Sequence, residues 1–165
     1  HLAFAFATEG LRVSIVRYFN SYGPHLDEKG YGSVIANFIR QARDGDPLTV
    51  HGDGLQTRCF TFVADTVRGT ILAGTKDEAL GSVFNIGSNY EISIADLARL
   101  IVDKTKSSSA ITNVSYEQRY GASFEDTRRR VPSLDRARSV LGYSPTIDLA
   151  EGLDRTLSWW NTVHT

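Results

Sequence analysis

The apolar positions of this chain follow two alternating periods, and each change of period marks a helix or a strand. Residues 1–10 are apolar at helical spacing and end at a glycine. Residues 11–19 are instead dense in β-branched and aromatic side chains, as in a buried strand. The segment 20–24 then ends the strand with Asn, Gly and Pro. A helix followed by a buried strand is half of a βαβ unit, which predicts a parallel sheet.

Later helices are marked by residues that cap helix starts. The expected helices begin after Ser33, near Asp65, at Ser93, at Ser133 and at Asp148. Short strands are expected between them, in "PLTVHGDG", "RCFTFV", "SVFNIGSN" and "NVSYEQ", whereas residues 120–130 have no period and are expected to form a loop. Alternating capped helices and strands favour α/β or α+β packing over an all-helical bundle.

Composition narrows the class of protein. With 165 residues and 41% hydrophobic content, the chain is long enough to bury one core. Its 18 basic and 19 acidic residues nearly cancel, so no overall field attracts nucleic acid or an anionic membrane. Cys59 is the only cysteine, which excludes an intrachain disulfide and favours the cytoplasm. The chain has no methionine and opens on an uncapped helical pattern, so we expect it to be the C-terminal portion of a longer protein.

The first candidate for chemistry is "RYFNSYGPH", residues 17–25, where a buried strand leaves the core with polar side chains. Ligands of open α/β sheets bind beyond the carboxyl ends of the strands, so Tyr18 and Asn20 are well placed to meet one. The alternative is a packing tyrosine and an Asx turn before the Gly-Pro pair.

Two arginine-bearing segments follow. In "HGDGLQTRCFTFV" the guanidinium of Arg58 can form two hydrogen bonds to a phosphate or a carboxylate, or it can be a solvated side chain at a strand edge. In "FEDTRRRVP" three adjacent arginines repel one another, and either a bound anion or the nearby Glu125 and Asp126 must offset this clustering. An anion clamp and a solvated loop with local ion pairs are both open.

Other motifs are absent from the sequence. Four scattered histidines and one cysteine give no recognisable metal site, and Cys59 has no histidine partner in motif spacing, which favours a buried thiol. No G-x-G-x-x-G motif occurs, and no tyrosine is followed four residues later by a lysine.

In this order, the segments "RYFNSYGPH", "PLTVHGDGLQTRCFTFVADTVRG", "FNIGS", "RRRVPSLDRARSVLGYSP" and "LAEGLDRTLSWW" resemble the C-terminal half of the extended short-chain dehydrogenases, the NAD-dependent nucleotide-sugar epimerases, dehydratases and decarboxylases. The resemblance covers nearly the whole chain. It implies an α/β fold: the C-terminal part of a Rossmann-type parallel sheet plus a smaller α/β substrate-binding domain. Residues 1–23 would be the remnant of the NAD-binding domain, and residues 24–165 mainly the substrate domain, with some segments returning to the sheet.

The resemblance also implies roles for individual residues. Tyr18 matches a position close to the nicotinamide of NAD. The implied nucleotide-sugar contacts are Asn20, Thr49, Val50, His51, Arg58 and Arg130. Residues 49–51 would lie along the base, and the two arginines would clamp the diphosphate and ribose from opposite sides. At the positions of Ser133 and Cys59, aspartate is frequent in the family. These two departures concern the residues that would support the arginine clamp.

The implied activity is transient oxidation of a sugar hydroxyl through a 4-keto intermediate, followed by reduction, dehydration or decarboxylation. The catalytic tyrosine and its lysine are expected before His1, so the 165 residues alone are expected to be inactive. The expected partners are a nucleoside-diphosphate sugar and a second copy of the chain. Two rivals remain: a non-enzymatic binding module, and an interaction domain that uses the apolar face of the first helix.

Overall fold

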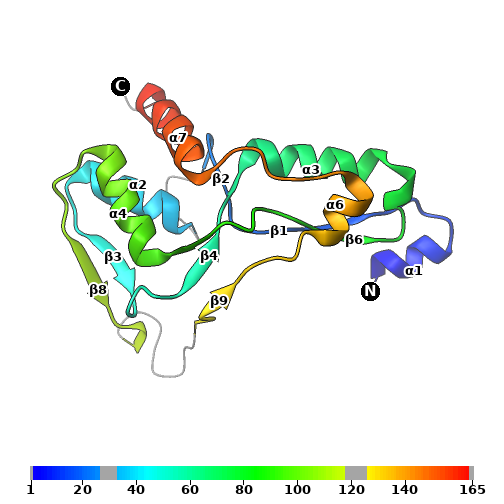
Figure 1. The fold of residues 1–165 in the computed structure, drawn as a ribbon, viewed down its shortest axis with the longest axis horizontal. Coiled ribbons are helices and arrows are strands. Elements are labelled where there is room, and N and C mark those ends of the chain that lie inside the picture. The colour runs from blue at the N-terminus through cyan, green and yellow to red at the C-terminus, as the bar shows by residue number, and fades with distance from the viewer. Residues whose placement is uncertain (1, 27–32, 118–125, 164–165) are drawn as a thin grey trace.

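The computed structural model describes residues 2–26, 33–117 and 126–163, which form the mixed α/β fold of Figure 1. The helices are α1 (Leu2–Thr8), α2 (Val34–Asp44), α3 (Val63–Thr75), α4 (Ile94–Thr105), α6 (Asp135–Leu141) and α7 (Leu149–Val163). The strands are β1 (Ile15–Tyr18), β2 (Ser21–Tyr22), β3 (Leu48–His51), β4 (Thr57–Cys59), β5 (Thr61–Phe62), β6 (Val83–Ile86), β7 (Glu91–Ser93), β8 (Ile111–Val114) and β9 (Arg129–Arg130). The predicted α/β class is confirmed.

Most strand pairs of the described residues are parallel. β1 pairs with β6, β2 with β5, and β3 with β8, each in parallel register. β4 lies between β7, which is antiparallel to it, and β9, which is parallel to it. The predicted parallel pairing is therefore confirmed. Strand β4 is the central strand of a three-stranded sheet and pairs with both β7 and β9.

Local capping explains why α4 and α7 begin where the sequence predicts, whereas α6 begins at Asp135, two residues after the expected Ser133, without a side-chain cap. The Ser93 hydroxyl accepts a hydrogen bond from the Asp96 backbone N–H at 3.0 Å, and the Asp148 carboxylate accepts one from the Glu151 N–H at 2.8 Å. Gly45 ends α2 with a φ of 76°, in the left-handed region. These contacts span only a few residues, so the sequence pattern locates them.

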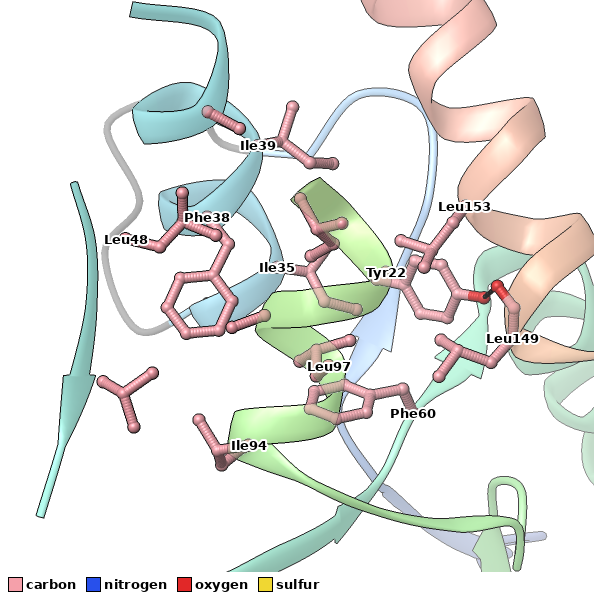
Figure 2. Packing of buried hydrophobic residues seen from close by; sticks show 14 of the residues in the cluster. Tyr22, Ile35, Phe38, Ile39, Leu48, Phe60, Ile94, Leu97, Leu149 and Leu153 are labelled. Atoms are coloured by element: carbon pink, nitrogen blue, oxygen red, sulfur yellow. Dashed lines mark hydrogen bonds between the residues drawn. The ribbon is translucent and has the colours of Figure 1, made fainter. Parts of the chain in front are cut away.

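Two buried apolar clusters hold the elements together. The larger one lies among α2, α4 and α7 with β3, and Figure 2 shows Tyr22 of β2 and Phe60, the residue between β4 and β5, reaching into it. The smaller cluster lies at the opposite end of Figure 1, where α3 and α6 pack on β1 and β6. Its buried members are Ala73, Ala79, Phe84, Ile86, Ala137, Leu141 and Tyr143. The division at residue 23 stays a prediction.

The strand expected in "NVSYEQ", residues 113–118, is formed instead by Ile111–Val114, the residues that pair with β3. Two further sequence expectations differ from the structure in extent. The strand expected over residues 11–19 is formed only by Ile15–Tyr18, because β6 pairs with these four residues and Leu11 is exposed. Part of the loop expected over residues 120–130 is the strand β9, which pairs with β4, while residues 120–125 lie outside the described part of the chain. Pairing with a distant strand decides both outcomes.

Candidate functional site

Asn20 lies where the predicted segments meet. It follows β1 with a φ of 41°, in the left-handed region that asparagine tolerates better than most residues. Its Nδ2 donates to the Cys59 carbonyl at 2.7 Å, and its Oδ1 accepts a hydrogen bond from Arg130 Nη2 at 3.0 Å. The end of β1, strand β4 and strand β9 are therefore joined through one amide side chain.

The three adjacent arginines separate in direction, and two of them pair with acids far away in the sequence. Arg128 bonds both oxygens of Asp53, at 2.8 and 2.7 Å, and Arg129 forms a two-pronged pair with Glu91, with contacts of 2.9–3.1 Å. These hydrogen bonds lower the pKa of each carboxyl, Asp53 and Glu91, below its ordinary value. The charge repulsion within the triplet is thus offset by partners that local sequence does not reveal.

Arg130 differs from its two neighbours because its hydrogen bond goes to a neutral group. Among the described residues no carboxylate lies within ion-pair distance of its guanidinium, and the side chain is exposed. A cation that is held by an amide and reaches water can accept an anionic ligand without first breaking a salt bridge.

Arg58 is buried, with 8% of the residue exposed, which excludes the solvated-edge interpretation. Its Nη1 donates to the carbonyls of Thr57 and Thr127, both at 2.7 Å, and its Nη2 bonds Asp126 Oδ1 at 2.5 Å. The alternative in which Asp126 offsets the arginine triplet is therefore wrong, because this carboxylate pairs with Arg58. Glu125, the other acid of that alternative, lies outside the described residues.

Arg58 and Arg130 occupy paired positions on the adjacent strands β4 and β9. The structure therefore brings the two predicted diphosphate contacts together, one buried and one exposed. Arg58 keeps its Nε–H and one Nη2 hydrogen without an acceptor among the described residues. Both guanidiniums retain donors for an anion.

The three predicted base-contacting residues on β3 serve different purposes. Thr49 is bonded to Gln41 through both its N–H, at 3.2 Å, and its hydroxyl, at 2.9 Å. Val50 is buried in the larger core at 1% exposure. The His51 carbonyl accepts a hydrogen bond from Gln56 Nε2 at 2.9 Å, and its ring lies edge-on to the Tyr116 ring. Val50 therefore contributes packing, while His51 contacts Gln56 and Tyr116.

Tyr116 is a site residue that the sequence prediction missed. Its hydroxyl bonds Asp126 Oδ2 at 2.8 Å and accepts a hydrogen bond from Gln56 Nε2, also at 2.8 Å. Burial and then the bond to Asp126 raise the pKa of Tyr116 to about 12, so the phenol stays protonated at neutral pH. No motif identifies such a residue, because its partners lie 10 and 60 positions away.

Tyr18, the predicted nicotinamide contact, ends β1 with half of its surface exposed. Its hydroxyl lies 3.0 Å from the Thr70 hydroxyl on α3, which holds the ring on the α3 side of the strand. An exposed aromatic ring at the carboxyl end of a parallel strand can contact a flat ligand.

The described residues contain no cluster of three or more metal-ligating side chains, and no helix among them could cross a membrane. The site thus offers cationic and amide donors around the ends of β1, β4 and β9. Such an arrangement suits binding and orienting a dianion such as a diphosphate.

Comparisons with known proteins show the family of this chain. A sequence model of the family described as GDP-mannose 4,6-dehydratase matches residues 3–156. UDP-N-acetyl-α-D-glucosaminuronate decarboxylase of Bacillus cytotoxicus is 41% identical over 98% of this chain and 50% of its own length. UDP-glucuronic acid decarboxylase 1 of Xenopus tropicalis is 38% identical over 92% of this chain and 34% of its own length.

Solved structures give the same picture of the fold. The UDP-glucose 4-epimerase of Thermotoga maritima with UDP-glucose superimposes with a TM-score of 0.88, at 29% identity, over 98% of this chain and 50% of that protein. The UDP-glucuronic acid 4-epimerase of Bacillus cereus, in complex with UDP-glucuronic acid and NAD, gives 0.86 at 27% identity, over 99% and 50%. The chain spans half or less of the length of these proteins.

Proposed function

Because this chain belongs to the GDP-mannose 4,6-dehydratase family of extended short-chain dehydrogenases, we propose that it is the nucleotide-sugar-binding part of an NAD-dependent epimerase, dehydratase or decarboxylase. The substrate is a nucleoside-diphosphate sugar, and the reaction passes through a 4-keto intermediate. Relatives and solved neighbours named for UDP-sugars favour a UDP-sugar.

The observation that carries this proposal is the pairing of Arg130 with Asn20 beside Arg58. Arg130 has no carboxylate partner among the described residues, although Arg128 and Arg129 beside it both do. An unpaired guanidinium, oriented by an amide and next to a second guanidinium, supports contact with the diphosphate. Asn20 then serves both to orient Arg130 and to approach the sugar.

The remaining predicted contacts are those with the base of the nucleotide and with the nicotinamide. The base lies along β3, where Thr49, Val50 and His51 supply a strand already fixed by the core and by two glutamine side chains. Tyr18 is the contact for the nicotinamide, and its exposed ring fits that role. When bound, NAD accepts hydride from the sugar hydroxyl, whereas the residues of this chain bind and orient the substrate.

The chain itself contains neither a Tyr-x-x-x-Lys pair nor a G-x-G-x-x-G motif. We therefore propose that these 165 residues supply specificity and binding but no proton or hydride transfer. We also propose a cytoplasmic enzyme that acts as a homodimer. The single cysteine supports the cytoplasm. The exposed apolar side chains of Phe6 in α1 and of Leu11 after it support the dimer.

Titration with UDP tests the proposal, using the protein made from its complete gene. Arg130→Ala is expected to lower the affinity by about 10- to 150-fold, the equivalent of about 1.5–3 kcal/mol for a lost charge-assisted contact. The matched control is Arg128→Ala, an adjacent exposed arginine that is already paired with Asp53, and it should change the affinity by less than about threefold. Equal affinities for wild type and Arg130→Ala would refute the diphosphate role.

A further inference from the structure

A continuous line of hydrogen bonds joins β3 to the buried Arg58. Gln56 Nε2 donates to the His51 carbonyl and to the Tyr116 hydroxyl, at 2.9 and 2.8 Å. The Tyr116 hydroxyl in turn bonds one oxygen of Asp126, and Arg58 bonds the other oxygen. We call Gln56, Tyr116 and Asp126 the relay.

The direction of every bond in the relay is fixed by the first one. The His51 carbonyl only accepts, so the Gln56 amide must turn its nitrogen toward it. Both hydrogens of that nitrogen are then used, and the Tyr116 oxygen has to accept one of them. The phenol's own hydrogen is left to donate to Asp126.

This orientation leaves the buried Gln56 Oε1 without a hydrogen-bond partner among the described residues. A buried unpaired acceptor is costly, and the residue is only 5% exposed. Packing holds the Tyr116 ring in place, since a Cβ added at Gly52 would lie 2.5 Å from it. The fold therefore keeps both N–H donors of Gln56 in use at the expense of its oxygen.

The relay determines how Arg58 is presented. With one Asp126 oxygen occupied by Tyr116, the other oxygen faces Arg58 Nη2 at 2.5 Å. Nη1 is held by two backbone carbonyls. Three fixed contacts leave the guanidinium little freedom to rotate, and its Nε–H and one Nη2 hydrogen have no acceptor within the part of the chain that the structure describes.

We propose that Tyr116 is a positioning residue for diphosphate binding: it orients Asp126, which holds the guanidinium of Arg58 toward the ligand. This inference rests on the proposed function, because it assumes that Arg58 contacts the diphosphate. It deepens that function by naming residues that act through Arg58 without touching the substrate themselves. It also links the strand along the base to the phosphate contact through His51.

The test is a double-mutant cycle with UDP and inorganic diphosphate as probes, in the protein made from its complete gene. Tyr116→Phe removes one hydroxyl and is expected to weaken UDP and diphosphate about tenfold. In an Arg58→Gln background the same substitution should cause no further loss, because Tyr116 then has no guanidinium to position. Tyr90→Phe, which alters an exposed tyrosine, is the matched control and should leave both affinities unchanged.

Asp126→Asn is the second variant, with the same expected loss and the same dependence on Arg58. The side-chain ¹⁵Nε signal of Arg58 should shift in Tyr116→Phe while the thermal midpoint of unfolding stays within a few degrees. A loss of affinity that persists in the Arg58→Gln background shows a merely structural role and overturns the proposal. So does an unchanged affinity of Tyr116→Phe in a protein whose UDP binding depends on Arg130, and that result leaves the proposed function intact. A wild-type protein that binds neither probe overturns both.

Discussion

Replacing Asp65 with asparagine tests how the C-terminal helix is attached to the rest of the fold. Asp65 lies in the first turn of α3 and is 1% exposed. Its carboxylate accepts hydrogen bonds from the backbone N–H groups of Thr146 and Ile147, at 2.9 and 3.0 Å, and from the Thr146 hydroxyl at 2.9 Å. Arg68 completes the set at 2.7 Å. One buried charge therefore ties α3 to the segment that leads into α7.

The expected cost follows from which of these bonds an amide can keep. The asparagine oxygen can still accept from the two backbone N–H groups, whereas the amide nitrogen would face Arg68 and lose the ion pair. Loss of one charge-assisted bond predicts a decrease of about 2–3 kcal/mol in the free energy of unfolding. Asp65→Ala removes all four bonds, so the backbone N–H groups of Thr146 and Ile147 lose their acceptor and Arg68 loses its buried partner, for which we expect about 3–5 kcal/mol.

Urea unfolding measures these values, with the fluorescence of Trp159 and Trp160 on α7 reporting the helix directly. The matched control is Asp77→Asn, which breaks an exposed ion pair with Arg12 and should cost less than about 0.5 kcal/mol. If Asp65→Asn unfolds at the same urea concentration as Asp77→Asn, the attachment through Asp65 is not a source of stability and the reasoning fails.

Acid should remove the difference between wild type and Asp65→Asn. Burial acts to raise the pKa of Asp65, but the bonds from Arg68, Ile147 and Thr146 together lower it below its ordinary value. A carboxyl whose pKa is lowered on folding stabilises the protein above its unfolded pKa, about 3.9, and loses that contribution as the pH falls through the folded pKa. We expect the full difference at pH 7 and a shrinking one below about pH 4.

A glycine substitution and a thiol-labelling reaction are two further tests of packing. Gly152→Ala on α7 would place a Cβ 2.1 Å from the hydroxyl of the buried Tyr22, so we expect a loss of about 1–3 kcal/mol in urea unfolding, partly restored by Tyr22→Phe. Gly74→Ala on α3 meets no atom within 4 Å and should stabilise instead, so an equal effect of the two would contradict the packing argument. Cys59 is fully buried, which raises the pKa of its thiol to about 11, so iodoacetamide at pH 8 should modify it only after unfolding. Rapid labelling of the native protein, measured by mass, would show this burial to be wrong.

The sequence predicts best what depends on neighbours in the chain. The starts of α4 and α7 are located correctly because Ser93 and Asp148 cap residues only three positions away. Strands β7 and β9 are not predicted, because a run of two or three residues becomes a strand only by pairing with β4. Non-local pairing has no local signal.

The same distinction explains the candidate site. Family motifs identify Asn20 and Arg130, and the structure brings them together over 110 positions. The partners of the arginines could not be predicted, because Asp53 and Glu91 lie 75 and 38 positions from the residues they neutralise. Asp126 lies only two positions before the arginine triplet, but it pairs with Arg58 on β4. Arg129 and Arg130 are instead in β9, where they lie opposite Thr57 and Arg58.

The contacts around strand β4 bear on the departure at Cys59 from the family's frequent aspartate. Asn20 uses the Cys59 carbonyl, which any residue at this position supplies, and the Cys59 side chain is fully buried. The carboxylate that supports Arg58 comes instead from Asp126, held by Tyr116. An aspartate at position 59 would bury a second charge, and Arg58 and Arg129 already have carboxylate partners, so Arg130, which is bonded to Asn20, would be the neighbouring arginine left to pair with it. We therefore expect the relay, and not the side chain at position 59, to orient the guanidinium of Arg58 in this chain.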